Sequence, residues 1–218
     1  EESVFLGSAA ERGDWAVEVE AALARIRRAA ARRKPLALLG TAFSFVHLLD
    51  LMVEGDLAVQ LAPGSRVMET GGYKGRSRAL SRPELHLLIA ERLGVLRTHI
   101  LSEYGMSELS SQAYDGVIGS TDLVSGCPDR RSAGAPPATP RFQFPPWART
   151  RVVSAETGRE VADGQTGLVR VFDLANVYSI MAIQTEDLAI RRGEGFELIG
   201  RAARAEPRGC SLMATATV

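Results

Sequence analysis

The hydrophobic positions of the N-terminal part alternate between helical and strand-like spacing. Apolar residues recur at helical spacing from Trp15 to Ala30, and Asp14 is placed to cap that helix. Pro35 ends the segment, and residues 36–39 then form a short apolar run that predicts a buried strand. A second apolar helix is predicted over residues 43–53.

The same alternation continues along the chain. Residues 66–69 and 98–102 predict two further short strands, on either side of a third helix that ends at Gly94. Ser81 precedes that helix and Glu84 follows three residues later, which is the spacing of a capping box. Alternating helices and short apolar strands predict an α/β fold with a mostly parallel sheet and flanking helices.

The pattern changes after residue 126. Residues 127–149 are rich in proline and predict a connector with little regular structure. Strands are predicted beyond it at 150–155, 167–172, 179–184 and 196–199. We therefore expect an α/β nucleotide-binding portion over 1–126, a proline-rich connector over 127–149 and a smaller β-rich region over 150–218.

Composition narrows the classes of function. Lys plus Arg and Asp plus Glu both number 26, so the charge gives no reason to expect nucleic acid as a partner. No apolar run is long enough to span a bilayer. The two cysteines, Cys127 and Cys210, lie far apart without a metal-type spacing, which favours a reducing cytoplasm over a disulfide framework. The chain does not begin with Met, so we expect a fragment or a processed chain.

The most informative string runs from Tyr104 to Leu109 and follows a predicted strand, where α/β sheets bind their ligands. The Tyr104 ring can stack on a base, and Gly105 lets the backbone approach a ligand. Ser107 can contact a phosphate, and Glu108 can hold Mg²⁺, which prefers oxygen ligands. An ordinary strand-to-loop turn explains the same string, and the residues alone leave both interpretations open.

This string resembles the Tyr-Gly-x-Thr-Glu motif of adenylate-forming enzymes, with Ser107 in place of threonine. Three more motifs of those enzymes occur in this chain, and all four have the same order along the sequence as in those enzymes. Gly71-Gly72 resembles the turn beside the adenine, and Thr185-Glu186-Asp187 resembles a Thr-Gly-Asp whose aspartate holds the ribose hydroxyls. Gly200-Arg201 resembles a Gly-Arg whose arginine reaches toward the ribose.

Longer strings narrow the resemblance to one branch. Residues 69–77, 104–114 and 200–212 are similar to the acyl-protein synthetases of the bacterial luciferase-associated kind, in their C-terminal portion. The resemblance implies that ATP and Mg²⁺ activate a fatty acid, or another carboxylic acid, as acyl-AMP. The acyl group would then pass to Cys210, beside Arg204 and Arg208, and onward to an acyl reductase or another acceptor protein. A buried structural role for Cys210 is the alternative.

Two other functions remain open. The chain also fits an acyl- or aryl-coenzyme A ligase of the same superfamily, or a non-catalytic interaction module that keeps the fold. No phosphate-binding loop is recognisable over residues 1–64, so we expect the upstream portion to be missing and this fragment alone to be inactive. His47, His86 and His99 lack the partners of a triad or a metal site, and we expect them to be structural.

Overall fold

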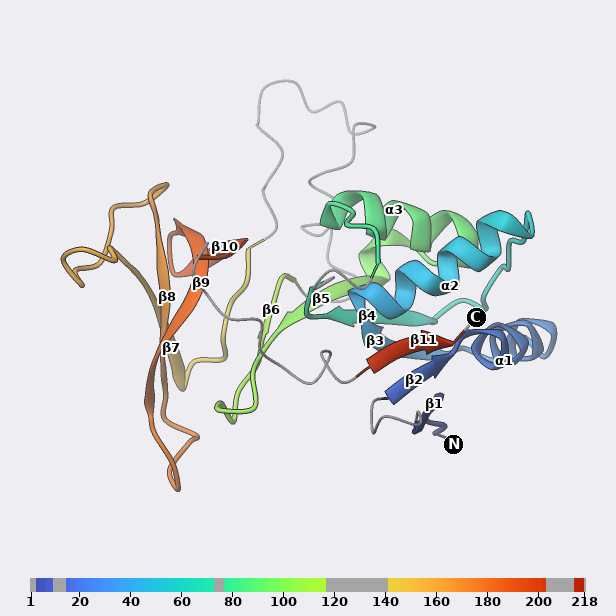
Figure 1. Ribbon diagram of the computed structural model, residues 1–218, viewed down its shortest axis with the longest axis horizontal. Coiled ribbons are helices and arrows are strands. Elements are labelled where there is room, and N and C mark those ends of the chain that lie inside the picture. The colour runs from blue at the N-terminus through green and yellow to red at the C-terminus, as the bar shows by residue number, and fades with distance from the viewer. Residues whose placement is uncertain (1–2, 10–14, 73–76, 117–140, 203–213, 218) are drawn as a thin grey trace. The chain divides into compact units, whose positions relative to one another are not determined.

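The computed structural model describes residues 3–9, 15–72, 77–116, 141–202 and 214–217 (Figure 1). The chain divides into two compact units, residues 1–100 with 208–218 and residues 101–207. Each unit has its own hydrophobic core. The division into 1–126, 127–149 and 150–218 stays a prediction.

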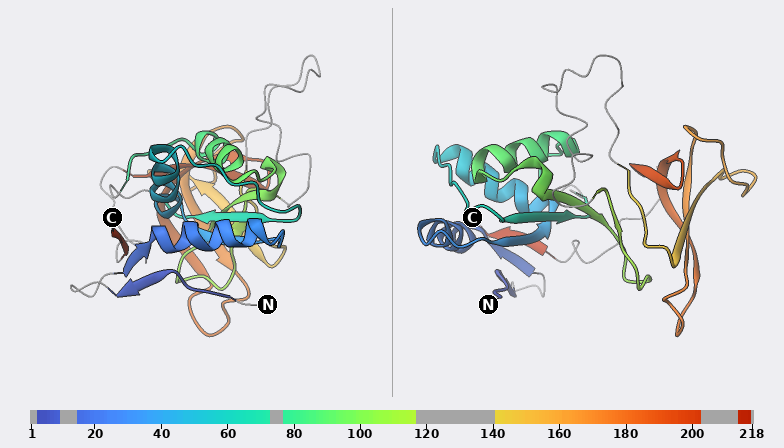
Figure 2. Two further views of the ribbon diagram at one scale, coloured as in Figure 1. Left: turned by 90° about the vertical axis from the view of Figure 1, so that its right-hand side faces the viewer. Right: turned by 180° about the vertical axis from the view of Figure 1, so that it is seen from behind.

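The first unit contains helices, a parallel strand pair and a small separate sheet. Its described elements are β1 (Gly7–Ala9), β2 (Trp15–Glu18), α1 (Val19–Ala31), β3 (Ala37–Thr41), α2 (Ala42–Glu54), β4 (Arg66–Thr70), α3 (Arg82–Leu93), the 3₁₀ helix η1 (Arg97–His99) and β11 (Ala214–Thr217). β3 and β4 pair in parallel, from Ala37 opposite Arg66 to Thr41 opposite Thr70. The helix α2 packs against both α1 and α3 (Figures 1 and 2).

The core of the first unit explains why these segments are helical. The apolar face of α1 buries Leu23 and Ile26, and α2 is buried along most of its length, with Phe43 and Leu49 fully enclosed. Residues spaced three and four apart share one face of a helix, so the apolar spacing in the sequence becomes this core. The start of α3 has the predicted capping box, and Gly94 ends the helix in the left-handed conformation.

The predicted start of the first helix is wrong. α1 begins at Val19, whereas Trp15–Glu18 form β2, which pairs antiparallel with β1 and parallel with β11. Its partner β11 lies about 200 residues away along the chain, at 214–217. Pairing of this kind overrides local helical spacing because it satisfies the backbone N–H and C=O groups in a ladder.

The second unit is mainly antiparallel. Its described elements are β5 (Ile100–Tyr104), which spans the unit boundary, β6 (Ala113–Tyr114), β7 (Ala148–Val153), β8 (Thr166–Asp173), β9 (Ala182–Arg192) and β10 (Gly195–Arg201). The last four form a sheet in the order β10-β9-β8-β7, and β5 pairs antiparallel with β6. Isolated bridges join Gln143 to Tyr114 and Phe142 to Phe196. The predicted fold class, a mostly parallel α/β portion followed by a smaller β-rich region, is confirmed.

Two of the differences between the predicted and the observed strand bounds affect the site motifs. The strand expected at 98–102 is β5 at Ile100–Tyr104, so Tyr104 ends a strand instead of starting a loop. The strand expected at 179–184 is β9 at Ala182–Arg192, which includes the whole Thr185-Glu186-Asp187 motif. Polar residues inside a strand interrupt the apolar pattern from which strands are predicted. Most of the predicted connector lies outside the described residues, but its end, from Ala148, belongs to β7.

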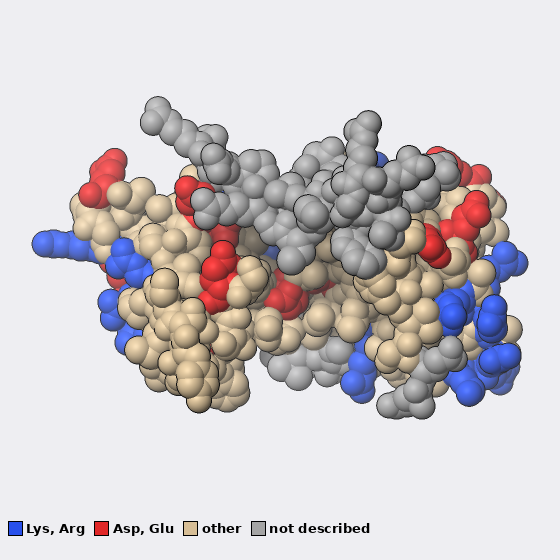
Figure 3. Space-filling view, turned by 60° about the horizontal axis from the view of Figure 1, so that its bottom comes forward, with Lys and Arg blue, Asp and Glu red and all other residues tan. Residues whose placement is uncertain are grey.

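Charged side chains are unevenly distributed over the first unit. Basic side chains gather at its right-hand end in Figure 3. The exposed basic residues of α1 and of the turn after it are Arg25, Arg27, Arg28, Arg32, Arg33 and Lys34. Cations at the C-terminal end of a helix complement its dipole, which accounts for much of this group. Among the described residues, no helix is long and apolar enough to cross a bilayer.

Candidate functional site

The site is built on two irregularities in the sheet of the second unit. Leu168 of β8 lies opposite Leu188 of β9, but Arg170 lies opposite Gln184, so three residues of β9 face Val169 alone. These three residues are the Thr185-Glu186-Asp187 motif. β10 has one extra residue, Ile199, between the pairs that it forms with β9. Bulges of this kind re-aim side chains and are common beside active sites.

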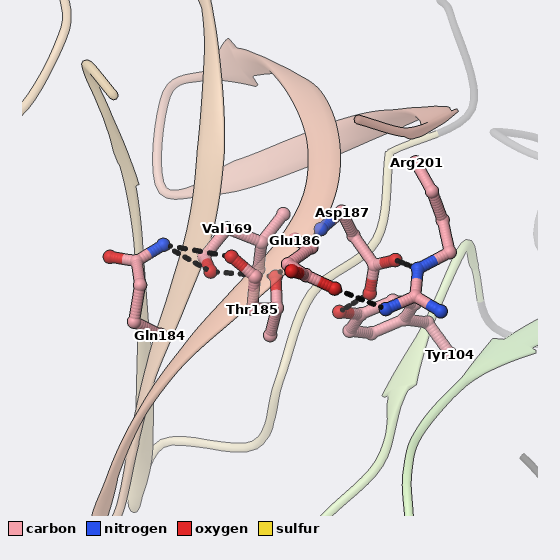
Figure 4. A network of polar contacts seen from close by, with 7 residues as sticks. All are labelled: Tyr104, Val169, Gln184, Thr185, Glu186, Asp187 and Arg201. Atoms are coloured by element: carbon pink, nitrogen blue, oxygen red, sulfur yellow. Dashed lines mark hydrogen bonds and ion pairs between the residues drawn. The ribbon is translucent and has the colours of Figure 1, made fainter. Parts of the chain in front are cut away.

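Side chains of the motif stabilise the bulge on β9. The Thr185 hydroxyl donates to the Val169 carbonyl at 2.8 Å and accepts from the Asp187 N–H at 3.1 Å. The Gln184 amide also donates to the Val169 carbonyl, at 3.3 Å (Figure 4). A buried carbonyl left out of its ladder needs such donors. Thr185 therefore fixes the backbone that carries Asp187.

Asp187 has a partner on each of its two carboxylate oxygens. The Tyr104 hydroxyl donates to Oδ2 at 2.7 Å, and the Arg201 Nε lies 3.2 Å from Oδ1 (Figure 4). The Asp187 side chain is 17% exposed. Arg201 stands opposite Asp187 in the register of β10 with β9. Three residues that lie 14 to 97 positions apart in the sequence thus form one polar group, with a carboxylate that solvent still reaches.

The Tyr104 ring lies in an aromatic cluster. It is 7% exposed and makes ring contacts with Phe142, Phe144 and Phe196 at centroid distances of 5.9, 6.3 and 5.2 Å. Burial and the neighbouring Asp187 carboxylate raise the pKa of Tyr104 far above its usual value. The hydroxyl is therefore neutral and a hydrogen-bond donor at neutral pH.

Glu186 occupies the position where the motif of adenylate-forming enzymes has glycine. Its carboxylate is 51% exposed and lies 3.2 Å from the Arg201 Nη2. Among the described residues, the non-glycine residues with a positive φ are Arg33 and Asp56. The backbone at Glu186 is therefore open to any residue, and the departure from the motif leaves the bulge intact.

Ser107 and Glu108 lie together in an exposed turn after β5. The Ser107 hydroxyl is 3.3 Å from the Glu108 carboxylate, and the Leu109 N–H donates to the Met106 carbonyl at 3.1 Å. Gly105 precedes them, and a side chain there would meet the Glu103 carboxylate. The carboxylate of Glu108 thus faces solvent, as a ligand to a substrate-bound cation would have to.

Sequence reasoning missed two residues that hold this turn, Asp173 and Asn176. The Asp173 carboxylate is fully buried and accepts the N–H groups of Ser110 and Ser111 at 3.0 and 2.8 Å. The Asn176 amide donates to the Glu108 carbonyl at 2.8 Å. An Asp at the end of an apolar strand is a weak signal, since it is as common in ordinary turns.

Gly71 and Gly72 belong to the first unit, where they follow β4. Gly71 has a φ of +70°, which explains the need for glycine, and a Cβ at either position would meet no atom of the described residues within 4 Å. The other predicted site residues that the structure describes belong to the second unit.

The remaining candidates are three histidines with described contacts and a group of residues that the structure leaves undescribed. His86 Nε2 lies 3.5 Å from the buried Glu69 Oε1, His47 packs edge-on against Phe43, and His99 Nδ1 is 3.2 Å from the Thr98 hydroxyl. No cluster of three or more His, Cys, Asp or Glu that could hold a metal occurs among the described residues. Cys210, with Arg204 and Arg208, lies outside them.

The fold is that of part of an adenylation domain. The chain superposes on McyG A-PCP complexed with phenylalanyl-adenylate at a TM-score of 0.55 and 15% identity, over 85% of this chain and 29% of that one. An adenylation domain of a keto acid-selecting module bound to keto acyl adenylate matches at 0.55 and 17%, over 84% and 38%. The amide bond synthetase McbA of Marinactinospora thermotolerans matches at 0.52 and 15%, over 84% and 34%.

In sequence, the chain is similar to the long-chain-fatty-acid–luciferin-component ligase of Aliivibrio fischeri. The two are 22% identical over 208 residues, which cover 90% of this chain and 49% of the ligase. The predicted resemblance to the acyl-protein synthetases is thus confirmed as a distant relationship. The chain spans about half the length of that relative. No family model matches the chain.

Proposed function

We propose that this chain carries the adenosine-facing part of an enzyme that activates a carboxylic acid with ATP as acyl-AMP. The observation that carries the proposal is the position of the Asp187 carboxylate. It contacts Tyr104 and Arg201, it is held where β9 and β10 are irregular, and solvent still reaches it. The adenylation-domain fold and the distant similarity to an acyl ligase support the same chemistry.

Asp187 fits the role of ribose ligand. A carboxylate has about four acceptor positions. The Tyr104 hydroxyl and the Arg201 guanidinium use one position on each oxygen, so about two are left for the two ribose hydroxyls. Because its partners fix the carboxylate before the nucleotide binds, little conformational freedom is lost on binding. The Arg201 side chain is 34% exposed, and its guanidinium would reach toward the ribose.

Tyr104 acts mainly through Asp187 in this proposal. Its ring is covered by the aromatic cluster, so its chief contribution is the hydroxyl that positions the carboxylate. The role of Gly71 and Gly72 beside the adenine stays a prediction from their sequence motif. Gly105 would keep side-chain bulk away from the start of the turn that carries Ser107 and Glu108.

The exposed Glu108 carboxylate fits a magnesium ion that is shared with the substrate. Mg²⁺ is usually bound through one or two carboxylates plus phosphate oxygens, so a single glutamate is a sufficient protein ligand. When bound, the ion would offset negative charge on the phosphates. The substrate carboxylate oxygen would attack the α-phosphorus, and pyrophosphate would leave.

The finer part of the proposal concerns the acid and its acceptor. We take the acid to be a fatty acid, and the second step to be attack of the Cys210 thiolate on the acyl carbonyl, with AMP leaving. The resulting thioester would pass its acyl group to a partner such as an acyl reductase. This part rests on the distant similarity to a long-chain-fatty-acid ligase.

The test uses the complete protein, a labelled fatty acid and ATP with Mg²⁺, beside a Cys210→Ser variant and a Cys127→Ser control. We expect wild type and control to form acyl-AMP and to carry label that neutral hydroxylamine releases from the denatured protein. The Cys210→Ser variant should form acyl-AMP and carry no label. If acyl-AMP forms but neither wild type nor control carries label, the acyl-cysteine step is wrong and transfer to coenzyme A is favoured. If no acyl-AMP forms with any acid tried, the proposed enzyme activity is wrong and the interaction module is favoured.

A further inference from the structure

Asp173, the last residue of β8, is a fully buried carboxylate outside the polar group around Asp187. Its Oδ2 accepts the N–H groups of Ser110 and Ser111. Its Oδ1 accepts the Ser111 hydroxyl at 2.9 Å and the Ala175 N–H at 3.0 Å. Burying a carboxylate is costly unless hydrogen bonds compensate it, and these four donors supply that compensation.

Three of these four donors belong to Ser110 and Ser111, in the turn that carries Glu108. Ser110 and Ser111 follow Glu108 after one intervening residue, Leu109, and the Ser111 hydroxyl also accepts from the Trp147 indole at 3.0 Å. Asn176 completes the arrangement. Its amide donates to the carbonyls of Glu108 and Ile180, at 2.8 and 2.9 Å, and its side-chain oxygen accepts the Ser110 hydroxyl at 3.1 Å.

These contacts fix the backbone on which the Glu108 carboxylate is carried. The Asn176 amide donates to the Glu108 carbonyl, and Asp173 accepts the N–H groups of the residues two and three positions after Glu108. The Glu108 side chain is exposed and contacts the Ser107 hydroxyl. The direction of that side chain therefore depends on a backbone that is held from the β8–β9 connection.

We propose that Asp173, together with Asn176, is a positioning residue that sets where the Glu108 carboxylate lies when magnesium and ATP bind. The inference rests on the proposed function for the role of Glu108. The hydrogen bonds of Asp173 to the turn do not depend on it. Asp173 touches neither nucleotide nor acid in this proposal, and its effect reaches the reaction through Ser110, Ser111 and Glu108.

The first measurement is amide hydrogen exchange in the complete protein, for wild type and Asp173→Asn. An asparagine replaces one acceptor oxygen with an NH₂ group, which then faces N–H donors. We expect exchange over residues 105–112 to become at least tenfold faster. The matched control is Asp163→Asn, because the Asp163 carboxylate also accepts a backbone N–H, that of Gly193 at 2.6 Å, in another turn. The control should leave exchange over 105–112 unchanged.

The second measurement is the magnesium dependence of acyl-AMP formation. Loss of a residue that orients a metal ligand commonly costs ten- to hundredfold in metal affinity, so Asp173→Asn should raise half-saturation for Mg²⁺ at least about tenfold. Asp163→Asn should change it less than about twofold. In a Glu108→Gln background the effect of Asp173→Asn should disappear, because the ligand that it positions is gone.

The outcomes distinguish a failure of the proposed function from a failure of the positioning role. Absence of acyl-AMP in wild type would remove the proposed function, and unchanged exchange over 105–112 in Asp173→Asn would overturn the positioning role whatever the activity. Unchanged magnesium dependence, or an equal effect in the Glu108→Gln background, would overturn the link to Glu108. If Asp173→Asn does not fold, Asn176→Ala serves in both measurements, because it removes the hydrogen bond to the Glu108 carbonyl.

Discussion

Arg201 and Asp187 are cross-strand partners on β10 and β9, and their ion pair joins Nε to Oδ1 at 3.2 Å. The pairing depends on the extra residue Ile199. With regular alternation after Leu198, Gly200 would stand opposite Asp187 and Arg201 opposite Glu186. The bulge therefore selects which of two adjacent carboxylates lies opposite the arginine.

This relationship predicts unequal effects of removing the two charges. Asp187→Asn should weaken ATP use by about 30- to 150-fold in kcat/KM, because a charged hydrogen-bond partner contributes about 2–3 kcal/mol. Glu186→Gln should change kcat/KM for ATP less than about threefold, since the carboxylate is half-exposed and screened. Steady-state kinetics of acyl-AMP formation, with ATP varied, provides the comparison. Equal losses in the two variants would contradict the assignment of the ribose to Asp187.

The hydroxyl of Tyr104 should contribute to stability. Tyr104→Phe keeps the ring in its aromatic cluster and removes the bond to Asp187. We expect a loss of about 1–2 kcal/mol in the free energy of unfolding at neutral pH, measured with urea. Tyr178→Phe, at a fully exposed side chain, should leave it unchanged. A Tyr104→Phe variant as stable as wild type would show that the bond makes no net contribution.

The hydrogen bond between Tyr104 and Asp187 predicts that the free energy of unfolding changes with pH in the alkaline range. The folded protein raises the pKa of Tyr104 above its unfolded value of 10.0, so the contribution of the neutral hydroxyl is complete below pH 10. Above it the unfolded chain loses this proton first, and the contribution should fall by about 1.4 kcal/mol per pH unit. The stability difference between wild type and Tyr104→Phe should therefore shrink between pH 10 and 11. A difference that is constant over this range would be evidence against a buried neutral hydroxyl.

In the turn after β4, substitution of the two adjacent glycines should have unequal effects on the free energy of unfolding. Gly71 has a φ of +70°, whereas Gly72 does not have a positive φ. Gly71→Ala should cost about 1 kcal/mol in the free energy of unfolding because of the left-handed backbone. Gly72→Ala should cost clearly less, since a Cβ at either position would meet no atom of the described residues within 4 Å. Thermal unfolding of the two variants provides the test, and equal costs would point to packing instead of backbone conformation.

The capping box of α3 predicts a pH-dependent contribution. The Ser81 hydroxyl accepts the Glu84 N–H at 3.4 Å, and the Glu84 carboxylate accepts the Ser81 N–H at 2.7 Å. Ser81→Ala should cost about 1 kcal/mol. The hydrogen bonds from Ser81 lower the pKa of Glu84 from 4.5, so its contribution is present above that pH and is lost as the pH falls through the lowered value. Chemical denaturation at pH 7 and below pH 4 should show a smaller effect of Ser81→Ala in acid, and Ser77→Ala serves as a loop control.

Where local patterns dominate, the sequence was sufficient for a correct prediction. The helix α2 and the capping box of α3 follow from residues within a few positions of one another, through apolar spacing and short side-chain-to-backbone bonds. The site motifs at Tyr104, Asp187 and Arg201 were recognised from their residue types and order. β2 was mistaken for the start of a helix because its partners β1 and β11 come from other parts of the chain.

The sequence by itself determined the fold class, and its motifs predicted Tyr104, Asp187 and Arg201 as site residues. The tertiary structure alone decided how Asp187 lies between Tyr104 and Arg201, and which residue holds the turn of Glu108. Neither could be predicted, because a single bulged residue such as Ile199 changes which side chains face each other. The role of Asp173 was hidden for a related reason, since its hydrogen bonds cross more than sixty residues of chain to Ser110 and Ser111.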